Sequence, residues 1–365
     1  MRPVVVVTSD VPPDRVASFR ALHERMPLLV ARFGGDRRHA TRGVDDPGVP
    51  VRDVAEREVA RLAGGARAVV AGTVGRVALP AAYLGARRAR VPFVLWTALW
   101  AHPRTPAHAL SWPLLRHLYR HADAVVTYGD HVSAYVRARG AENVHVAPQA
   151  VDPAFWTRGG EAPGSGGAAA TGGAAVTGGA AATAAPAAPF RALFVGRLAP
   201  EKGIDVLLDA WRRAGVDGEL VVVGPGEPRA AAPGVTFTGP LPPAHVRNFI
   251  ARASVLVMPS VATRAFREPW GLVANEAMHM NVPVIATDAV GAAAGGLVRH
   301  ERNGLVVPAN DAEALAAAIR RAAADDTLRQ ALGRNAGRDA AAFTPEAWAA
   351  GMAGAIESAE LRRNR

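Results

Sequence analysis

The sequence predicts an α/β protein with two doubly wound domains, and three observations lead to this prediction. The chain has 365 residues, more than the roughly 100 to 200 residues of a typical domain, so two domains are expected. Short apolar runs alternate with stretches of helical periodicity, which is the pattern of parallel strands joined by crossover helices. The pattern stops at a Gly/Ala-rich segment and then restarts, so the boundary between the domains should lie there.

Residues 1–157 form the first predicted domain. Its short apolar runs predict strands at Val4–Thr8, Leu28–Ala31, Ala68–Ala71, Pro92–Thr97, Ala124–Thr127 and Val144–Ala147. Stretches of helical periodicity lie between several of these strands and predict helices. One of them runs through Val51, Val54, Ala55, Val59 and Leu62.

Residues 158–189 separate the two predicted domains. This segment reads RGGEAPGSGGAAATGGAAVTGGAAATAAPAAP and has no large apolar residue and almost no charge. Such a composition cannot bury enough apolar surface to offset the entropy lost on ordering. We therefore expect a flexible low-complexity linker.

Residues 190–345 form the second predicted domain. Its expected strands are Ala192–Val195, Leu220–Val223, Val235–Thr238, Val255–Met258, Val284–Thr287 and Leu305–Val307. Its expected helices are Ile204–Ala214, Pro243–Ala253, Leu272–Met280 and Asp311–Ala323. An Ala-rich helix in residues 346–365 follows, and the pattern leaves open whether it packs on this domain or returns to the N-terminal one.

Composition and charge limit the classes of function. The chain has no Cys, which excludes disulfides, thiolate metal sites and cysteine nucleophiles. Its formal net charge is +10, and residues 1–157 alone contain 21 Arg against 13 acidic residues. Such a field attracts nucleotide phosphates or anionic lipid headgroups. Nucleic acid is not expected as a partner, because the arginines are not interleaved with aromatic residues.

The chain contains no obvious membrane-spanning or targeting segment. The longest apolar stretch, Val91 to Ala101, is much shorter than the roughly 20 residues that a membrane helix needs. The apolar run at the N-terminus is too short for a signal peptide. We expect a cytoplasmic protein, with peripheral contact to the inner membrane surface as a hypothesis.

The stretch GRLAPEKGID, Gly196 to Asp205, contains the single Lys among the 42 basic residues of the chain, Lys202. It follows a predicted strand and precedes a predicted helix, so Arg197 and Lys202 should lie near a helix N-terminus. Free N–H groups and the helix dipole favour phosphate there, and two cations would suit a diphosphate. A local ion pair of Arg197 with an acid of the same stretch is the alternative.

A second stretch, REPWGLVANEAM, spans Arg267 to Met278 and contains Glu268 and Glu276. Both carboxylates should approach one ligand from the N-terminal end of the helix predicted from Leu272. A carboxylate accepts two hydroxyl hydrogen bonds at once, which suits the neighbouring hydroxyls of a ribose or a hexose.

These stretches, in this order, resemble the retaining family 4 glycosyltransferases. That family has the GT-B fold, in which two doubly wound Rossmann-like domains face an interdomain cleft. The resemblance covers residues 191 to about 343 and rests on the segments VGRLAPEKGID, VVVGPGEP, VTFTGP, ASVLVMPS, EPWGLVANEAM, VPVIATDAVGA and NGLVVPANDAEALAAAI.

The resemblance implies roles for the residues of the C-terminal half. Arg197 and Lys202 would bind the diphosphate of a nucleotide-sugar donor and stabilise it as it leaves. Glu276 would bind the ribose hydroxyls, and Glu268 the hydroxyls of the transferred sugar, as a positioning group rather than a nucleophile.

Glycines and backbone groups complete this implied donor site. Gly224 and Gly226 would let the backbone approach the nucleotide base, and Gly271 and Leu272 would line the donor site. Backbone N–H groups of Ala289 to Ala292 would also approach the donor, although the family usually has a Gly pair there.

The N-terminal half matches the family less well. Gln149-Ala150 replaces the usual Asn-Gly of the domain-crossing segment, and the first loop lacks the usual Gly pair. His102 lies where family members often place a His near the sugar, with His108 as a weaker candidate. A surface His, or one that caps the next helix, is the alternative. Two arginines, Arg15 and Arg104, are expected to face the cleft.

The implied reaction is transfer of a hexose from a nucleoside diphosphate sugar to an acceptor hydroxyl, with retention at the anomeric carbon. No metal or other cofactor is expected. The acceptor is unknown; the basic N-terminal half suggests a lipid-linked or anionic acceptor, as in glycan, glycolipid or polysaccharide biosynthesis, and a small soluble acceptor stays open. The alternatives are a sugar-nucleotide epimerase, a phosphorylase-like enzyme and a non-catalytic nucleotide-sugar-binding module.

Overall fold

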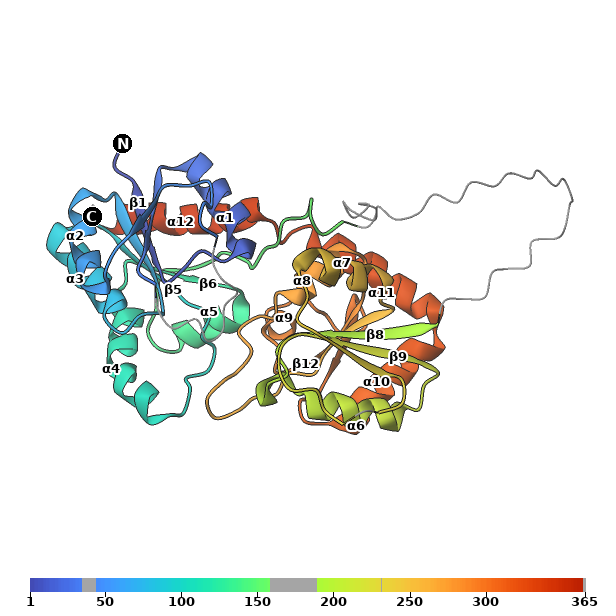
Figure 1. The fold of residues 1–365 in the computed structure, drawn as a ribbon. Coiled ribbons are helices and arrows are strands. Elements are labelled where there is room, and N and C mark those ends of the chain that lie inside the picture. Colours follow the sequence, from blue (N-terminus) through green and yellow to red (C-terminus); the bar gives the residue numbers. More distant parts are fainter. Residues whose placement is uncertain (35–43, 158–188, 231, 364–365) are drawn as a thin grey trace, which may run out of the picture.

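The structure is a computed structural model that describes residues 1–34, 44–157, 189–230 and 232–363. It shows two α/β domains side by side (Figure 1), each built on one parallel sheet, so the predicted fold class is confirmed. Residues 158–188 of the predicted linker lie outside the described residues.

The sheet of the N-terminal domain has seven parallel strands in the order β3-β2-β1-β4-β5-β6-β7. These strands are β1 (Val4–Thr8), β2 (Leu28–Arg32), β3 (Val51–Asp53), β4 (Ala68–Gly72), β5 (Phe93–Trp96), β6 (Ala124–Thr127) and β7 (Val144–Val146). The helices of this domain are α1 (Pro13–Arg25), α2 (Val59–Leu62), α3 (Ala78–Ala89), α4 (Pro106–His121) and α5 (Asp130–Arg137), with short 3-10 turns η1 (Glu56–Glu58) and η2 (Ala63–Gly65).

The sheet of the C-terminal domain has six parallel strands in the order β10-β9-β8-β11-β12-β13. Its strands are β8 (Phe190–Val195), β9 (Gly218–Val223), β10 (Val235–Gly239), β11 (Val255–Met258), β12 (Val284–Thr287) and β13 (Gly304–Val307). Its helices are η3 (Pro200–Lys202), α6 (Ile204–Ala214), α7 (Pro243–Arg252), α8 (Val273–His279), α9 (Gly291–Ala294), α10 (Ala312–Ala324) and α11 (Asp326–Ala340).

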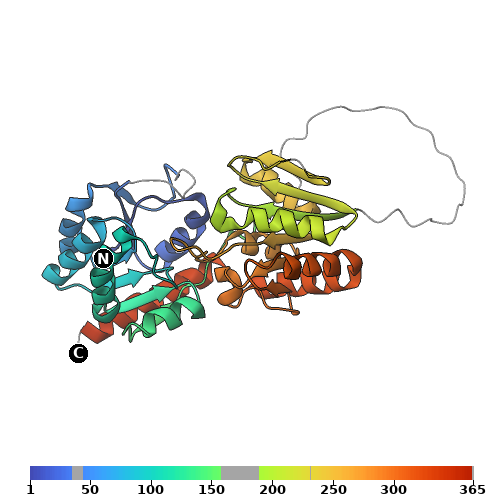
Figure 2. The ribbon, with the colours of Figure 1, turned by 90° about the horizontal axis from the view of Figure 1, so that it is seen from below.

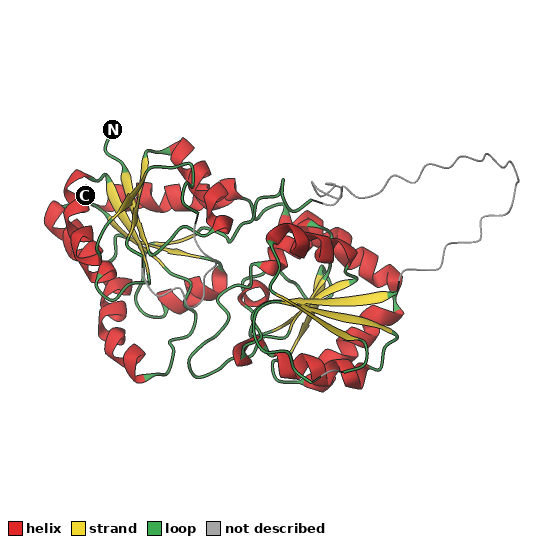
Figure 3. Ribbon diagram, in the orientation of Figure 1, coloured by secondary structure: helices red, strands yellow, loops and turns green. Residues whose placement is uncertain are grey.

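Helices cover both faces of each sheet (Figure 3), and this explains the continuous apolar runs of the central strands. In β1 the four valines Val4 to Val7 are at most 2% exposed. Both faces of β1 are buried, so its residues need not alternate between apolar and polar. β1 pairs with β2 and with β4, so the strand order reverses beside it, at the point where ligands of doubly wound sheets usually bind.

The last helix, α12 (Pro345–Arg363), leaves the C-terminal domain and packs on the N-terminal one, against α1 and strands β5 to β7. Figure 2 shows it ending at the far side of that domain. Its Trp348 is fully buried, and its ring centroid lies 5.6 Å from those of both Phe19 and Trp96. This aromatic cluster fixes α12 beside the carboxyl ends of the N-terminal strands.

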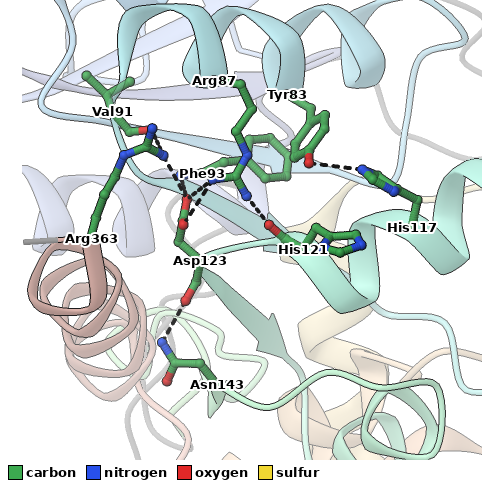
Figure 4. A network of polar contacts seen from close by, with 9 residues as sticks. All are labelled: Tyr83, Arg87, Val91, Phe93, His117, His121, Asp123, Asn143 and Arg363. Atoms are coloured by element: carbon green, nitrogen blue, oxygen red, sulfur yellow. Dashed lines mark hydrogen bonds and ion pairs between the residues drawn. The ribbon is translucent and has the colours of Figure 1, made fainter. Parts of the chain in front are cut away.

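A polar network around Asp123 fixes the other end of α12 (Figure 4). The Asp123 carboxylate accepts the backbone N–H of Phe93 at 2.7 Å and contacts the guanidinium groups of Arg87 at 3.2 Å and Arg363 at 3.4 Å. Its backbone carbonyl accepts the Asn143 side-chain amide at 2.8 Å. The network therefore ties α3, α12 and two strands together at the amino edge of the sheet.

The strand β3 and the helices α9 and α11 differ from the sequence predictions. Residues Val51–Asp53 form the edge strand β3, with Val51 paired to Val30, so the predicted helix beginning at Val51 is wrong. Only the later part of that stretch is helical, in short turns from Glu56 onward. The 15-residue helix α11 was not predicted; Asp325 caps it by accepting the backbone N–H of Leu328 at 2.8 Å.

In the described part of the chain, no helix combines the length and apolar character needed to cross a membrane.

Candidate active site

The candidate residues of the C-terminal domain lie on the loops and helix starts that follow four neighbouring strands. In the sheet order these strands are β9, β8, β11 and β12, and all of them run parallel. Their following loops therefore emerge at one edge of the sheet, the carboxyl edge, where doubly wound folds bind ligands.

The loops after β8 and β9 are held together by their backbones. Gly196 N donates to Val223 O at 2.9 Å, and Leu198 N donates to Pro225 O at 2.8 Å. Gly224 has a φ of 145°, and a Cβ atom there would lie 1.9 Å from Gly196 O. Only glycine fits such an approach. Gly224, which was predicted to let the backbone approach a ligand, thus lies where the loops after β8 and β9 contact each other.

Arg197 lies at the end of β8 and pairs locally. Its Nη2 donates to Glu201 Oε1 at 2.8 Å, which is the alternative that the sequence left open. Burial alone would raise the pKa of Glu201, but its own backbone N–H, Arg197 and Lys202 together hold that pKa below its usual range. Glu201 is therefore the anion that pairs with Arg197, and a diphosphate would compete with it for this cation.

Lys202 ends the short turn η3, and its Nζ donates to Glu268 Oε2. The hydroxyl of Ser260, in the loop after β11, donates to the same oxygen at 3.4 Å. The Lys202 side chain is 20% exposed and that of Glu268 is 8% exposed. The structure thus brings together a cation and an acid that lie 66 residues apart in the sequence.

Glu276 lies in the first turn of α8, and its environment disfavours its charge. Burial, followed by the negative charge of Asp14 in α1, raises the pKa of Glu276 to about 8. The side chain keeps partial exposure, so a ligand can still reach it. Asp14 lies in the first turn of α1, in the N-terminal domain.

Gly271 and Leu272 shape the start of α8. Gly271 has a φ of 90°, and a Cβ there would lie 2.3 Å from the side chain of Met258. Leu272 is the N-cap residue of the helix. These two residues set the direction in which α8 leaves the loop that carries Glu268.

The predicted approach of backbone N–H groups from Ala289 to Ala292 is wrong for three of the four residues. Val290 N donates to Thr287 O at 3.1 Å, Gly291 N to Glu268 O at 3.1 Å, and Ala292 N to Trp270 O at 2.7 Å. The N–H groups of Gly291 and Ala292 hold the Glu268 loop, and that of Val290 bonds to the end of β12.

The histidine predicted near the sugar is held by the next helix. His102 Nε2 is hydrogen-bonded to the backbone carbonyl of His108 at 2.8 Å, and its ring packs on Trp112 with centroids 4.8 Å apart. His108 in turn contacts the hydroxyl of Thr105, the N-cap residue of α4, at 2.6 Å. His102 therefore packs against the first turns of α4 in this structure.

The two arginines predicted to face the cleft have different surroundings. Arg15 is 8% exposed; its Nη2 donates to Gln149 Oε1, and its guanidinium lies 5.4 Å from the ring centroid of Trp96. Arg104 is exposed, and its backbone N–H donates to Arg264 O of the other domain at 2.6 Å.

Sequence reasoning missed the N-terminal residues that contact the candidate site. Trp100 and His131 donate to backbone carbonyls of the Glu268 loop, and Asp14 acts on Glu276. Gln149 accepts the Asn275 side-chain amide through its backbone carbonyl at 2.9 Å. The only available signal was that Trp100 shares the stretch WTALWAHPRT with His102, and that Gln149 stands at a departure from the family pattern.

The described residues contain no group of three or more His, Asp or Glu side chains arranged to hold a metal ion.

Comparisons with known proteins agree with the resemblance of the C-terminal half. Residues 189–325 match the family model described as glycosyl transferases group 1. The D-inositol 3-phosphate glycosyltransferase of Jonesia denitrificans is 34% identical over 175 residues, 42% of this chain and 39% of that protein. The putative teichuronic acid biosynthesis glycosyltransferase TuaC of Bacillus subtilis is 35% identical over 132 residues, 36% of this chain and 32% of that protein. This chain thus matches well under half the length of these relatives.

Solved structures extend the similarity to both domains at the level of the fold. Anabaena HepE, solved in complex with UDP and glucose, superposes with a TM-score of 0.73 at 18% identity, covering 98% of this chain and 100% of that one. Sucrose-phosphate synthase from Thermosynechococcus elongatus superposes with a TM-score of 0.69 at 19% identity, covering 97% and 98%. The two-domain arrangement of the chain is therefore GT-B.

Proposed function

We propose that this chain, a GT-B protein whose C-terminal domain belongs to the glycosyl transferases group 1, transfers a hexose from a nucleoside diphosphate sugar to an acceptor hydroxyl. The observation that carries the proposal is the contact between Lys202 and Glu268 at the carboxyl edge of the C-terminal sheet. The contact sets an ammonium beside a carboxylate. This pair suits a nucleotide sugar, which presents a phosphate beside sugar hydroxyls.

In this proposal the donor replaces the internal partners of the two cations. The diphosphate would take Arg197 from Glu201 and Lys202 from Glu268, and the freed Glu268 carboxylate would accept hydroxyls of the transferred sugar. Glu276 would accept the ribose hydroxyls from the first turn of α8. The HepE structures with UDP and UDP-glucose support a nucleotide-sugar donor.

The proposed reaction retains the configuration at the anomeric carbon. The bond from that carbon to the diphosphate oxygen breaks, and the acceptor oxygen bonds to the same face of the sugar while its proton passes to the leaving phosphate. Arg197 and Lys202 stabilise the charge that develops on the diphosphate. We propose that this reaction needs no divalent ion, so activity should persist in excess EDTA.

A non-catalytic nucleotide-sugar-binding module is the second candidate. It is favoured by the position of His102, whose ring is hydrogen-bonded to the carbonyl of His108 within its own domain. A module would bind the donor and release no product.

A donor screen followed by product analysis tests the proposal. Thermal shifts with a panel of nucleoside diphosphates and nucleotide sugars identify the donor, because a ligand that binds the folded state raises the unfolding temperature. Mass spectrometry with candidate acceptors and with water then detects transfer or hydrolysis. Binding without any turnover would favour the module, and no binding of any nucleotide would refute both candidates.

The acceptor is proposed to be lipid-linked, because the N-terminal domain has a surface suited to an anionic membrane. Residues 59–122 contain nine Arg and no acidic residue. Exposed faces of α3 and α4 lie next to each other, joined by the contact of Tyr83 Oη with His117 Nε2 at 3.0 Å. We name them the α3–α4 surface; its exposed residues include Arg76, Val77, Leu84, Arg88, Leu110, Arg116 and Arg120.

This surface combines the two features that hold a protein on an anionic bilayer. Leu110 is 84% exposed and Leu84 is 49% exposed. Exposed arginines lie near both leucines in the sequence. Apolar side chains insert at the level of the headgroups, while arginines attract anionic lipid. A peripheral contact at the inner membrane surface would bring the N-terminal domain to a lipid-linked acceptor.

Co-sedimentation with vesicles tests the membrane contact. Binding to phosphatidylglycerol vesicles at low salt, and its loss at high salt or on phosphatidylcholine vesicles, is expected from charge attraction. The variant Leu110→Ser with Arg116→Ser should bind less, whereas Leu361→Ser, which removes an exposed Leu from α12, should not. Failure of the wild type to bind phosphatidylglycerol vesicles at low salt would exclude this contact.

A further inference from the structure

The loop that carries Glu268 is hydrogen-bonded to the N-terminal domain at three backbone carbonyls. The loop follows β11, and the donors come from the segment after β5 and from the first turn of α5. The pairs are Arg104 N to Arg264 O at 2.6 Å, Trp100 Nε1 to Glu268 O at 3.0 Å and His131 Nε2 to Pro269 O at 3.1 Å. Two of these carbonyls belong to Glu268 itself and to the residue that follows it.

Two contacts of its ring fix the orientation of the Trp100 indole. The Arg267 guanidinium lies 3.6 Å from the centre of its ring, and the His131 ring meets it edge-on with centroids 4.9 Å apart. A cation over an indole face and a T-shaped ring contact both restrict rotation of the side chain. The N–H of Trp100 is therefore held in the direction of the Glu268 carbonyl.

His131 is suited to a permanent role as a donor. Burial lowers its pKa and nearby Arg267 lowers it further, although the hydrogen bond to Pro269 opposes both. The neutral ring has one N–H, and Nε2 carries it, because Nε2 faces a carbonyl while Nδ1 is buried without a partner. The bond to the Glu268 loop therefore does not depend on protonation of the ring at neutral pH.

The backbone of Glu268 is thus held from both domains. Its carbonyl also accepts Gly291 N at 3.1 Å from its own domain, so that one oxygen receives a donor from each side. The side chain of the same residue reaches Lys202. A side chain points reproducibly only when the backbone that carries it is fixed, and here the other domain does part of the fixing.

We propose that Trp100 and His131 are positioning residues that orient Glu268 for the transferred sugar. The inference rests on the proposed function, since it takes Glu268 as the group that binds sugar hydroxyls. It adds that recognition of the sugar depends on these two residues of the N-terminal domain, whereas Arg197 and Lys202, which would bind the diphosphate, belong to the C-terminal domain.

The test compares a nucleotide sugar with its nucleoside diphosphate. Trp100→Phe keeps an aromatic face for Arg267 and removes the N–H donor together with the smaller ring of the indole. Isothermal titration would measure UDP against UDP-glucose and GDP against GDP-mannose. For the pair that binds, the variant should have about five-fold to ten-fold lower affinity for the nucleotide sugar, which is the effect of one lost hydrogen bond. Its affinity for the nucleoside diphosphate should stay within about two-fold of the wild-type value.

Matched variants separate positioning from a general loss of structure. Trp211→Phe makes the same chemical change in α6 and should alter neither affinity. The double variant with Trp100→Phe and Glu268→Gln should bind the nucleotide sugar as tightly as the single variant Glu268→Gln, because Trp100 acts through Glu268. Additive losses in this double variant would overturn the inference.

The remaining outcomes are also distinct. If Trp100→Phe keeps the wild-type ratio of the two affinities, or weakens both ligands equally, the positioning role is wrong while the proposed function stands. If the wild type binds neither pair of ligands and no other nucleotide of the donor panel, the proposed function fails and the inference fails with it.

Discussion

Two acids of this protein, the partly buried Asp123 and the buried Glu268, are both paired with cations, but at opposite edges of their sheets. Asp123 lies at the amino edge of the N-terminal sheet and contacts a backbone N–H and two guanidinium groups, from β5, α3 and α12 (Figure 4). Glu268 lies at the carboxyl edge of the C-terminal sheet, and its carboxylate contacts one ammonium and one hydroxyl, both on loops.

The difference separates a structural ion pair from a candidate binding site. The partners of Asp123 belong to three fixed elements, so no ligand can replace them without loosening the fold. A carboxylate has about four acceptor positions, and Glu268 gives both of its contacts through one oxygen, Oε2. Its partner Lys202 has a flexible stem and can turn to a phosphate.

The largest effect is expected from Lys202→Ala. Loss of this cation should lower turnover about a hundred-fold to a thousand-fold, because the charge on the leaving diphosphate loses a preorganised partner. The unfolding temperature should stay close to that of the wild type, because the Lys202 side chain is partly exposed and ends a short turn. Steady-state kinetics and thermal unfolding measure the two quantities. Arg229→Ala, which removes a partly exposed cation of the same domain that pairs with Asp205, is the control.

Asp123→Ala should give the opposite result. It leaves the Phe93 N–H and two guanidinium groups without their acceptor, which should lower the free energy of unfolding by about 3 kcal/mol. Donor affinity, measured below the unfolding transition, should not change. Urea denaturation followed by circular dichroism measures the loss. Asp326→Ala, at an exposed ion pair with Arg329, should cost less than about 1 kcal/mol. A fully stable Asp123→Ala variant with weak donor binding would reverse the assignment of the two sites.

The pH dependence of donor binding should report Glu276. Its pKa is raised to about 8, so the carboxyl is mostly protonated at pH 7 and ionised at pH 9. Because only the carboxylate accepts two ribose hydroxyls, affinity should rise by roughly ten-fold over this range, as the ionised fraction does. Titration calorimetry at a series of pH values measures it. Asp14→Asn should move the midpoint to lower pH, and Glu276→Gln should remove the dependence.

The same shift predicts a trend in stability with the opposite sign. The folded protein keeps the Glu276 proton up to about pH 8, whereas the unfolded chain loses it near the ordinary pKa of 4.5. The contribution of Glu276 is therefore fully present below pH 4.5 and is lost as pH rises through about 8. The difference in unfolding temperature between the wild type and Glu276→Gln should change across this window. A constant difference would mean that the pKa is not raised.

The sequence predicted both sheets and most of their strands because local patterns determine them. Continuous valine runs such as Val4 to Val7 can only be buried strands when helices flank them. It failed at β3, where three residues at an edge carry too little pattern to compete with the helical spacing beyond them. The sequence also could not predict which domain α12 packs against, because its many alanines do not define an apolar face suited to one domain.

The candidate site, like the fold, contains residues that the sequence identified and residues that it missed. Arg197, Lys202, Glu268 and Glu276 were identified because they stand at fixed spacings beside turns and helix starts. The contributions of Trp100, His131, Asp14 and Gln149 depend on how two domains meet, and no spacing along the chain encodes that contact. The local pairing of Arg197 with Glu201 was one of two alternatives, and only the geometry of the turn decides between them.

The smallest effect is expected from Lys202→Arg, which asks why this chain has a single lysine. The charge is kept, but a planar guanidinium is wider than an ammonium and holds its donors in a rigid fork. Space is tight beside it, since a Cβ on the neighbouring Gly203 would lie 1.9 Å from Pro259 O. Donor affinity should fall about three-fold to ten-fold, measured by titration calorimetry, with Arg229→Lys as the reverse control. An unchanged affinity would show that the site needs only a positive charge, and that nothing in its shape selects lysine over arginine.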